Sequence, residues 1–268
     1  MRPVLFTIGP LPISAFGLFL LLAFWLGISM ARRRSSAAGV DPNTMLDLAL
    51  YMIIAGIVGG RIGYVLVNLP VFAKAPLTTL TIWRDAGLTF YGALGGGALV
   101  AWLYARARRI SAARFLDATA PGLAAGYAVA MIGALLHGLF RGKPSSVPWH
   151  VMMQHDADPR HPTQIYLLIA AVGIYLVVRR QRGGAPGVLV LIFLFLQAVS
   201  RFVVEFFVES PLVLGPLTLA QVAAAVVGVI SLAGLLLLGR RSDEVAGEAG
   251  WTAGSPPPAS PPAAPPSP

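Results

Sequence analysis

The stretch MLDLALYMIIAGIVGGRIGYVLV, residues 45–67, decides the fold class of this chain. It is almost entirely apolar, and about 20 apolar residues in a helix are enough to cross the hydrocarbon core of a membrane. Six other stretches are as long or nearly so, and we therefore predict an all-α integral membrane protein with about seven transmembrane helices. The expected spans are residues 13–30, 45–67, 88–105, 115–137, 164–178, 187–207 and 216–238.

The composition of the whole chain agrees with this class. Of its 268 residues, 56% are hydrophobic and only 12% are charged, and the mean hydropathy is +0.74. Soluble domains carry about 25% charged residues. The chain has no cysteine, which excludes disulfides, cysteine-ligated metals and a thiol nucleophile of its own.

Two segments that could suggest a cofactor site have simpler explanations. The segment WHVMMQHDADPRHPTQ, residues 149–164, gathers three histidines and two aspartates without a recognisable metal-ligand spacing, so we expect a solvated loop. In YGALGGGALV, residues 91–100, the glycines at 92 and 96 have the spacing of close helix packing. We therefore expect no metal and no organic cofactor.

The basic residues orient the expected helices. Twelve of them follow the first, third, fifth and seventh spans, whereas six (Arg2, Lys74, Arg84, Arg141, Lys143 and Arg160) fall on the other side. Short basic loops stay in the cytoplasm, which predicts an amino terminus outside and a carboxyl terminus inside. The net charge of +9 then reflects topology and contact with anionic lipid, and we see no nucleic-acid footprint in it.

The carboxyl-terminal residues have a different composition. From Ser242 the chain turns polar, and it ends in SPPPASPPAAPPSP, residues 255–268, which cannot bury enough apolar surface to fold. We expect a transmembrane domain over residues 1–241 and a disordered Pro/Ala/Ser-rich cytoplasmic tail over residues 242–268. The first span lacks a small-residue cleavage site, so we expect it to remain as an anchor.

Two charges lie inside the apolar run LQAVSRFVVEFFVE, residues 196–209. Arg201 and Glu205 are four residues apart, so on a helix they share a face and can pair. An unpaired charge in the bilayer core costs at least about 2.5 kcal/mol, and pairing reduces this cost without making the pair a net stabiliser. Two interpretations stay open: a structural ion pair, or part of a substrate path.

A second intramembrane arginine, Arg61, shares a helical face with Tyr64 and Asn68. Arg61 and Arg201 each lie six residues, or about 9 Å, from the expected outer end of their helix, so we expect them at one depth. The same layer is expected to hold polar or aromatic residues of other spans, namely Phe16, Tyr91, His137, His161, Gln164 and Tyr166.

The cations of the outer loop, Arg141 and Lys143, add to this positive layer. A phosphate at the level of the outer headgroups would explain the charge, because a guanidinium fork matches phosphate oxygens in two-point geometry. The alternative for each arginine is that its side chain extends to native headgroups without further function.

Six motifs in order carry a resemblance to a known family. They are GPLPISAFGLFLLLAF (9–24), GGRIGYVLVN (59–68), GLTFYGALGGG (87–97), HPTQIY (161–166), RFVVEFF (201–207) and GPLTLAQ (215–221). Together, over residues 7–238, they resemble the bacterial prolipoprotein diacylglyceryl transferase family. The resemblance implies a multi-pass inner-membrane enzyme that moves the diacylglyceryl group of phosphatidylglycerol to the lipobox cysteine of a prolipoprotein signal peptide and releases glycerol phosphate.

This chemistry suggests roles for the polar residues. Arg61 and Arg201 would bind the phosphate, Glu205 would hold Arg201, and Tyr91 would accept a proton or, as we prefer for a phenol of pKa near 10, hydrogen-bond the phosphate. The expected catalytic residues are Tyr91, Arg201 and Glu205. Phosphate binding is assigned to Arg61, Arg201, Arg141, Lys143 and Gly142, with Tyr64, Asn68, His137, His161, Gln164 and Tyr166 in support.

The chain also departs from the family pattern in the fourth span. Gly133 and Gly142 match, but the pattern's arginine, two asparagines and glutamate are replaced by Met131, Ala134, His137 and Leu139. Phe16 and Gln197 each stand where the family has a tyrosine, and Tyr91 stands where some members have a histidine. An alternative is therefore a catalytically degenerate paralogue that binds anionic lipid or prolipoprotein without turnover. A small transporter is disfavoured, because no internal repeat is present.

Overall fold

The computed structural model describes residues 4–9, 11–73, 79, 87, 89–153, 156–181 and 184–253. Within these ranges, the side chains of residues 8, 11, 90, 91, 94 and 240–253 are not described. Tyr91, an expected catalytic residue, is therefore placed only by its backbone.

In the part of the chain that the structure describes, seven long helices form where the seven spans are expected, and two small antiparallel hairpins accompany them. Strand β1 (Val4–Ile8) pairs with β2 (Leu11–Ser14), and β3 (Leu212–Leu214) pairs with β4 (Leu217–Thr218). The long helices are α1 (Ala15–Ser35), α2 (Pro42–Val67), α4 (Phe90–Arg108), α5 (Ala112–His137), α6 (Thr163–Arg180), α7 (Val188–Glu205) and α8 (Leu219–Ala253). Two short helices, η1 (Ser36–Ala38) and α3 (Leu69–Phe72), follow α1 and α2.

Six of the described helices are long and apolar enough to cross a membrane. They are α1 with η1, α2, α5, α6, α7 and the part of α8 up to Gly239. Helix α4 is not among them, because it is rich in glycine and carries Arg106 and Arg108 in its last turn. The fold is thus an all-α membrane protein with six candidate spans, and a seventh crossing by α4 stays a prediction.

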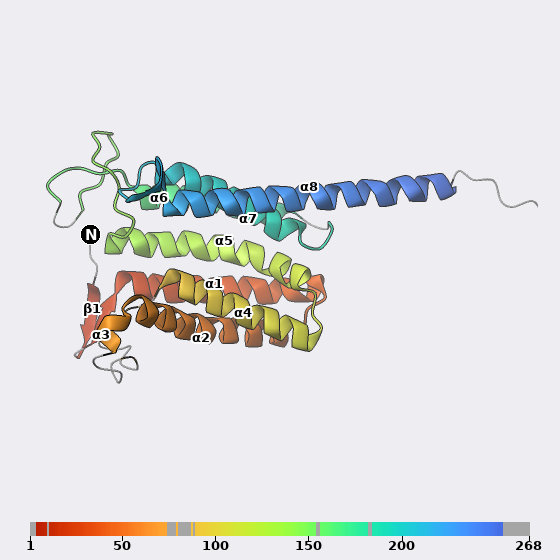
Figure 1. The fold of residues 1–268 in the computed structure, drawn as a ribbon, viewed down its shortest axis with the longest axis horizontal. Coiled ribbons are helices and arrows are strands. Elements are labelled where there is room, and N and C mark those ends of the chain that lie inside the picture. Colours follow the sequence, from red (N-terminus) through yellow and green to blue (C-terminus); the bar gives the residue numbers. More distant parts are fainter. Residues whose placement is uncertain are drawn as a thin grey trace, which may run out of the picture.

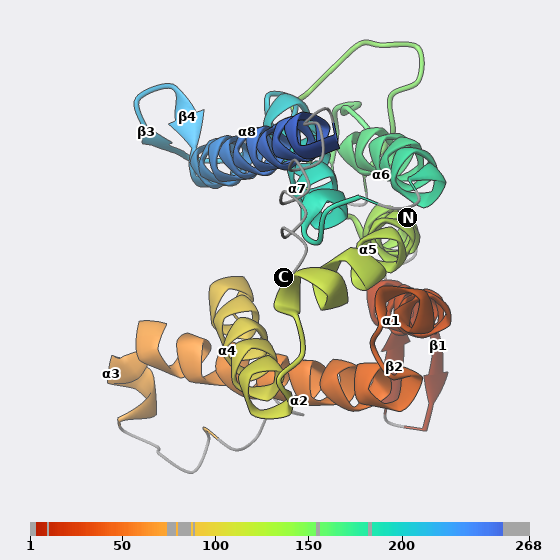
Figure 2. The same cartoon turned by 90° about the vertical axis from the view of Figure 1, so that its right-hand side faces the viewer.

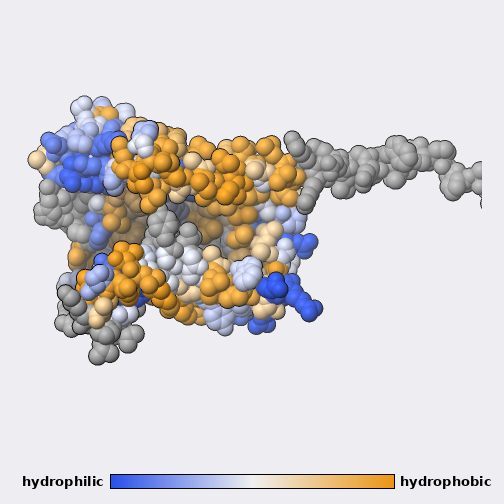
Figure 3. All heavy atoms as spheres, in the orientation of Figure 1, coloured by the Kyte–Doolittle hydropathy of each residue, from blue (hydrophilic) through white to orange (hydrophobic). Residues whose placement is uncertain are grey.

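Helix α5 lies at the centre of the bundle, between α1, α2 and α4 on one side and α6, α7 and α8 on the other (Figures 1 and 2). Of the 18-residue apolar stretch that makes α5 a candidate span, 56% is buried, which is more than in any other candidate span. Apolar surface covers the helices, and on the face seen in Figure 3 it forms two bands, over α8 and over the α2–α4 pair, with a hollow between them.

Close backbone contact joins α2 to α4, as the glycine spacing predicts. A Cβ atom on Gly92 would collide with the carbonyl oxygen of Gly59, and one on Gly96 would collide with that of Ala55. In contrast, a Cβ on Gly95 of the same helix would meet nothing within 4 Å. The packing interpretation of Gly92 and Gly96 is therefore confirmed.

Aspartates cap two of the helices. The Asp41 carboxylate accepts a hydrogen bond from Thr44 N (2.8 Å) at the start of α2, and this backbone bond holds the pKa of Asp41 below its usual value. Asp117, which belongs to α5, accepts from Gly187 N (2.7 Å) and Val190 N (2.8 Å) at the start of α7. A residue of the central helix therefore fixes the beginning of a neighbouring one.

The basic residues of two helices gather at one end of the bundle. Arg34, in the last turn of α1, donates through Nη2 to the carbonyl oxygen of Arg179 (3.1 Å), in the last turn of α6. The β1–β2 hairpin and the long α5–α6 connection lie at the opposite end (Figure 1). This asymmetry agrees with the charge count, and which end faces the cytoplasm stays a prediction.

Helix α8 continues beyond the expected boundary at residue 242. It extends as far as Ala253. Residues 242–253, SDEVAGEAGWTA, are polar but include the helix formers alanine and glutamate, which favour this extension. The proline-rich residues 254–268 lie outside the described ranges. The division into a membrane domain and a disordered tail stays a prediction.

Candidate active site

Arg201 and Glu205 form an ion pair on α7, as their spacing predicts. Arg201 Nη2 lies 2.7 Å from Glu205 Oε2, and the two side chains are 22% and 1% exposed. Thr218 Oγ1 donates a hydrogen bond of 3.1 Å to the other carboxylate oxygen, Oε1. The buried carboxylate is therefore held from both sides, by α7 itself and by the segment that leads into α8.

Thr218 also caps helix α8. Its Oγ1 accepts from Gln221 N (3.2 Å), and Gln221 Oε1 accepts from Thr218 N (3.0 Å), which is a reciprocal capping box. Sequence reasoning missed this residue, although TLAQ, residues 218–221, carries the capping-box spacing. One hydroxyl thus links the start of α8 to Glu205.

The ring of Phe140 packs against Arg201, with 5.1 Å between the guanidinium Cζ and the ring centroid. Phe140 lies in the turn after α5 and has a φ of 55°. The turn is fixed from α6, because Thr163 Oγ1 donates to the Phe140 carbonyl and Gln164 Nε2 donates to the Leu139 carbonyl. The HPTQIY motif therefore positions the aromatic ring that supports Arg201.

One edge of the Arg201 guanidinium is left for a ligand. Nη2 is used by Glu205, whereas Nη1 is buried and has no hydrogen-bond partner. An unsatisfied buried donor on a cation is costly unless a ligand satisfies it. The arrangement can bind an oxyanion whose position is set by Glu205 and Phe140.

Further buried polar atoms near the same end of the bundle lack hydrogen-bond partners, among them Gln197 Oε1 on α7, His137 Nδ1 at the end of α5 and Gln164 Oε1 at the start of α6. Tyr127 on α5, which sequence reasoning missed, packs against the buried cluster that includes Met131, Leu167 and Val204. Its apolar neighbourhood in the sequence gives little sign of this, because the contact joins two helices.

Arg61 belongs to a separate cluster. It is 4% exposed and donates through Nε to the carbonyl of Thr79 (2.9 Å) and through Nη1 to that of Gly87 (3.3 Å). Its Cζ lies 5.7 Å from the ring of Tyr64 and 5.4 Å from that of Phe72. These contacts tie Arg61 to the α2–α4 connection, whereas those of Arg201 lie with α5 and the α7–α8 hairpin.

The neighbours of Arg61 have structural contacts. Asn68 Nδ2 donates to the Tyr64 carbonyl (2.9 Å) at the end of α2, and the ring of Tyr64 packs edge-on against Phe72. The backbone of Tyr91 lies in the first turn of α4, and its side chain is outside the description. The role of Tyr91 therefore stays a prediction.

In the outer loop, Arg141 is engaged by carboxylates. It pairs with Asp156 and, at 3.4 Å, with Glu209. Arg160 completes the network, with Nε 2.6 Å from Asp156 Oδ2 and Nη1 2.7 Å from Glu209 Oε2. Two arginines and two acids thus form one ion-pair network in the outer loop. A phosphate-binding role of Arg141 stays a prediction.

Gly142 and Lys143 lie in an extended segment of this loop. A Cβ on Gly142 would collide with the His161 carbonyl, so glycine is required by close backbone packing. Lys143 N donates to the Phe207 carbonyl (2.8 Å), and its carbonyl accepts from His161 N (3.1 Å), while its side chain is exposed. The segment ties the end of α7 to the start of α6.

An aromatic cluster covers the same region. Tyr166 Oη accepts from the indole of Trp149 (2.9 Å) and lies 3.1 Å from His161 Nδ1. The ring of Phe207 packs against both His161 (5.0 Å) and Tyr166 (5.8 Å). Phe16 and His137 form a second aromatic contact, with 6.3 Å between the ring centroids. The expected single layer of polar and aromatic groups from five or six helices stays a prediction.

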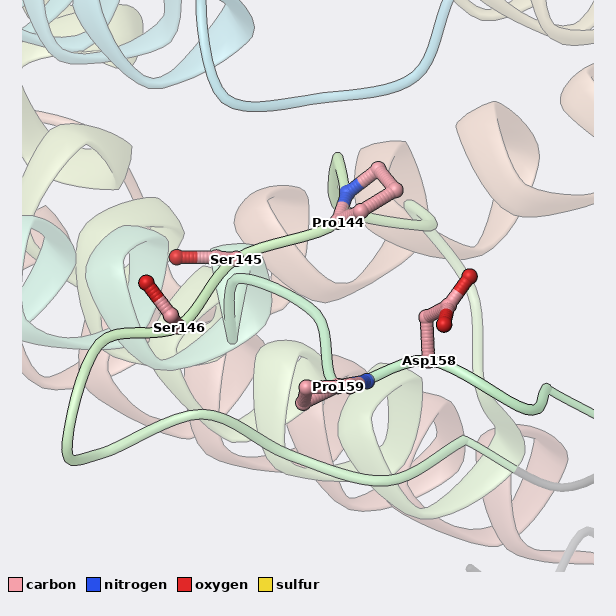
Figure 4. Close-up of a pocket in the computed structure, with 5 residues that line it drawn as sticks. All are labelled: Pro144, Ser145, Ser146, Asp158 and Pro159. Atoms are coloured by element: carbon pink, nitrogen blue, oxygen red, sulfur yellow. The ribbon is translucent and has the colours of Figure 1, made fainter.

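A shallow open depression of about 530 Å³ lies in the loop between α5 and α6 (Figure 4). It is lined by Pro144, Ser145, Ser146, Asp158 and Pro159. The lining has one acid and no cation, so the depression does not suit a phosphate. In the described ranges, no group of three or more His, Asp or Glu side chains could hold a metal ion.

The fold and this site together define a multi-pass helical membrane protein with an ion-paired arginine near one end of its bundle, whose Nη1 is buried without a hydrogen-bond partner. Comparison with known proteins gives the family. The model of the prolipoprotein diacylglyceryl transferase family matches residues 3–237, and the chain belongs to this family.

Similar proteins named phosphatidylglycerol–prolipoprotein diacylglyceryl transferase occur in several bacteria. The one from Trichormus variabilis is 30% identical and covers 88% of this chain and 89% of its own length. The one from Solidesulfovibrio magneticus is 33% identical over 90% and 95%, and that from Bordetella parapertussis is 34% identical over 80% and 84%.

Proposed function

We propose that this protein transfers the diacylglyceryl group of phosphatidylglycerol to the lipobox cysteine of prolipoproteins in the bacterial inner membrane. The observation that carries the proposal is the buried Arg201 Nη1, which has no hydrogen-bond partner although the rest of the guanidinium is held by Glu205 and Phe140. Family membership and the names of the relatives supply the substrate class.

The reaction needs stabilisation of a phosphate leaving group. The cysteine sulfur attacks the glyceryl carbon that carries the phosphate ester, a C–S bond forms, the C–O bond breaks, and glycerol phosphate leaves with the bonding electron pair. The thiol proton passes to a base or to the departing phosphate, so the step is redox-neutral. Arg201 Nη1 would meet the charge that develops on the phosphate oxygens.

Glu205 is a positioning residue in this scheme. Its carboxylate orients Arg201 and is itself oriented by Thr218, so the guanidinium presents Nη1 without reorganisation when the lipid binds. The family's fourth-span cation is absent at Met131, and of the arginines Arg141 and Arg201, it is Arg201 that has a buried Nη1 without a hydrogen-bond partner. Arg201 is therefore the cation that we assign to the phosphate, with Arg61 supporting the α2–α4 connection.

The function can be tested in cells depleted of their own diacylglyceryl transferase. Expression of this chain should restore growth and the labelling of lipoproteins by lipid. Good expression in the membrane with neither outcome would contradict the proposal. Such a result, together with retained binding of phosphatidylglycerol, would favour the degenerate paralogue.

Replacing Arg201 separates a phosphate-binding role from a structural one. Arg201→Lys keeps the charge and loses the planar fork, so we expect normal folding and a loss of transfer activity of about 10- to 100-fold. The control is the double variant Arg201→Leu/Glu205→Met, which should be as stable as wild type because an apolar pair replaces a buried ion pair. Melting temperature and phosphatidylglycerol binding are measured on the same preparations, and wild-type binding by the double variant would refute the role.

A further inference from the structure

We propose that His137, the last residue of α5, is the general base that takes the proton from the lipobox cysteine thiol. This inference rests on the proposed function and supplies a group that the transfer reaction needs. A cysteine thiol with a pKa of about 8.5 is mostly protonated at neutral pH, and the thiolate is the nucleophile. Histidine is the side chain that most often accepts such a proton in enzymes.

The first argument concerns a ring nitrogen of His137 that can accept a proton. Its Nδ1 is buried and has no hydrogen-bond partner. A neutral imidazole carries its proton on one nitrogen and accepts a hydrogen bond at the other. With the proton on Nε2, Nδ1 is a buried acceptor without a donor. Such atoms are rare in folded proteins, and the S–H group of a bound substrate would supply the missing donor.

The second argument concerns the direction in which His137 lies on α5. Gly133, about 40° away around the helix, packs closely on α1, because a Cβ on it would collide with Phe19. Ala134, about 60° away on the other side, belongs to a buried cluster with Val204 of α7. His137 therefore lies between the side of α5 that contacts α1 and the side that faces α7.

The third argument connects His137 to the Arg201 site through two aromatic rings. The centroid of the Phe16 ring lies 6.3 Å from that of His137, and the Phe140 ring packs against Arg201. Phe16 and Phe140 both pack on the buried cluster that contains Val204, which follows Arg201 by three residues on α7. His137 itself precedes Phe140 by three residues. The imidazole and the guanidinium therefore border one region of the bundle.

Two other residues near this region, Glu205 and His161, could also accept a proton, but each already has partners. Glu205 contacts Arg201 through Oε2 and accepts a hydrogen bond from Thr218 through Oε1. The Nδ1 atom of His161 lies 3.1 Å from Tyr166 Oη. The unpartnered nitrogen at the end of α5 is thus a better candidate for the base than either of them.

The end of a helix also suits the protonated state of the base. The last turn of α5 has His137 as its basic residue, and the partial negative charge at the carboxyl end of a helix stabilises a cation there. In the reaction, the thiol proton moves to Nδ1 and the sulfur electron pair forms the C–S bond. Glycerol phosphate leaves with the electron pair of the C–O bond, and the imidazolium then returns its proton to the phosphate or to water.

The test compares two synthetic signal peptides, one with the lipobox cysteine and one with selenocysteine in its place. A selenol is already ionised at neutral pH and needs no base. Transfer from phosphatidylglycerol is measured with the full chain in detergent under reducing conditions. His137→Asn keeps a hydrogen-bond acceptor but is not basic. We expect it to lose about 10²- to 10⁴-fold in transfer to the cysteine peptide, and less than about tenfold with the selenocysteine peptide.

The matched control is His150→Asn, the same change at an exposed histidine of the outer loop, whose Nδ1 contacts the Val147 carbonyl (2.8 Å). It should keep the wild-type rates with both peptides. Melting temperature and phosphatidylglycerol binding are measured on the same preparations. His137→Gln is made alongside, so that a folding defect of one variant does not decide the result.

Each other outcome overturns the inference in a distinct way. Wild-type activity of His137→Asn with the cysteine peptide would exclude His137 as the base and leave the proposed function intact. Equal losses with both peptides would show a structural role, or a phosphate contact if lipid binding weakens as well. A wild-type protein that modifies the selenocysteine peptide alone would have no working base. A wild-type protein that modifies neither peptide would overturn the proposed function together with the inference.

Discussion

Glu205 is the residue on which the geometry of the site depends. It is almost fully buried, and its two carboxylate oxygens are shared between Arg201 and Thr218. Removing either partner would leave part of a buried carboxylate unsatisfied, which costs about 1–3 kcal/mol or more for a charged group. The hydroxyl of Thr218 is therefore as much a part of the site as the arginine.

The variant Thr218→Val tests this dependence. It removes the hydrogen bond to Glu205 and one half of the α8 cap, so we expect a lower melting temperature and about a tenfold loss of transfer activity. Gln221→Ala is the control, because it weakens the same capping box without touching Glu205. It should lower the melting temperature by less than Thr218→Val does and preserve activity. Equal losses of activity in both variants would show that only the cap matters.

What the sequence reveals about these residues depends on how local each contact is. The Arg201–Glu205 pair could be predicted, because a spacing of four on a helix puts two side chains together. The ring of Phe140 over Arg201 could not, because it joins the turn after α5 to a residue of α7. Thr218 is an intermediate case. Its capping pattern can be recognised in the sequence, but its contact with Glu205 depends on the fold of the β3–β4 hairpin.

At the scale of the helices, hydropathy predicts where each helix forms and packing decides where it ends. The glycine spacing in α4 predicts its close contact with α2. The two hairpins were not predicted, because strands of two to five residues are too short for a clear alternation. The start of α7 is set by Asp117 of another helix, which no pattern in the α7 sequence contains.

The contact between α2 and α4 gives a prediction at this scale. Gly92→Ala would place a methyl group against the Gly59 carbonyl, so we expect the free energy of unfolding to fall by about 1–3 kcal/mol. Gly95→Ala, three residues away in the same helix, meets open space and should be neutral or slightly stabilising. Both are measured by denaturation in detergent. Equal effects of the two changes would mean that α4 does not pack on α2 through this face.

The whole molecule has two chemically distinct ends. The basic last turns of α1 and α6 meet at one end, and the hairpins, the α5–α6 loop and the Arg201 site lie towards the other (Figure 1). The positive-inside rule predicts that the Arg201 site faces the outside of the cell, the side on which the proposed transfer would take place. The orientation is therefore as important for function as the site itself.

Reporter fusions test the orientation directly. A fusion in the loop at Ser145 should report the outer side, and a fusion after Leu238 should report the cytoplasm. Ser145 lies in the α5–α6 loop and Leu238 near the end of the apolar part of α8, and both residues are partly exposed. Reporters that place both positions on the same side would remove the topological basis of the proposed function. A cytoplasmic signal at Ser145 with an outer signal after Leu238 would mean that the predicted orientation is inverted.

The Asp117 cap has a consequence for the order in which the protein is made. Ribosomes synthesise the chain from its amino end, so Asp117 is complete 70 residues before its partner Gly187. At about 5–20 residues per second, the carboxylate waits roughly 4–14 s for the backbone N–H groups that it will bind. During that interval it lies in the second turn of α5, near the membrane surface, where water can solvate it. Emergence of α7 then supplies its two donors, and the nascent helix is anchored at its first turn to a helix already in place.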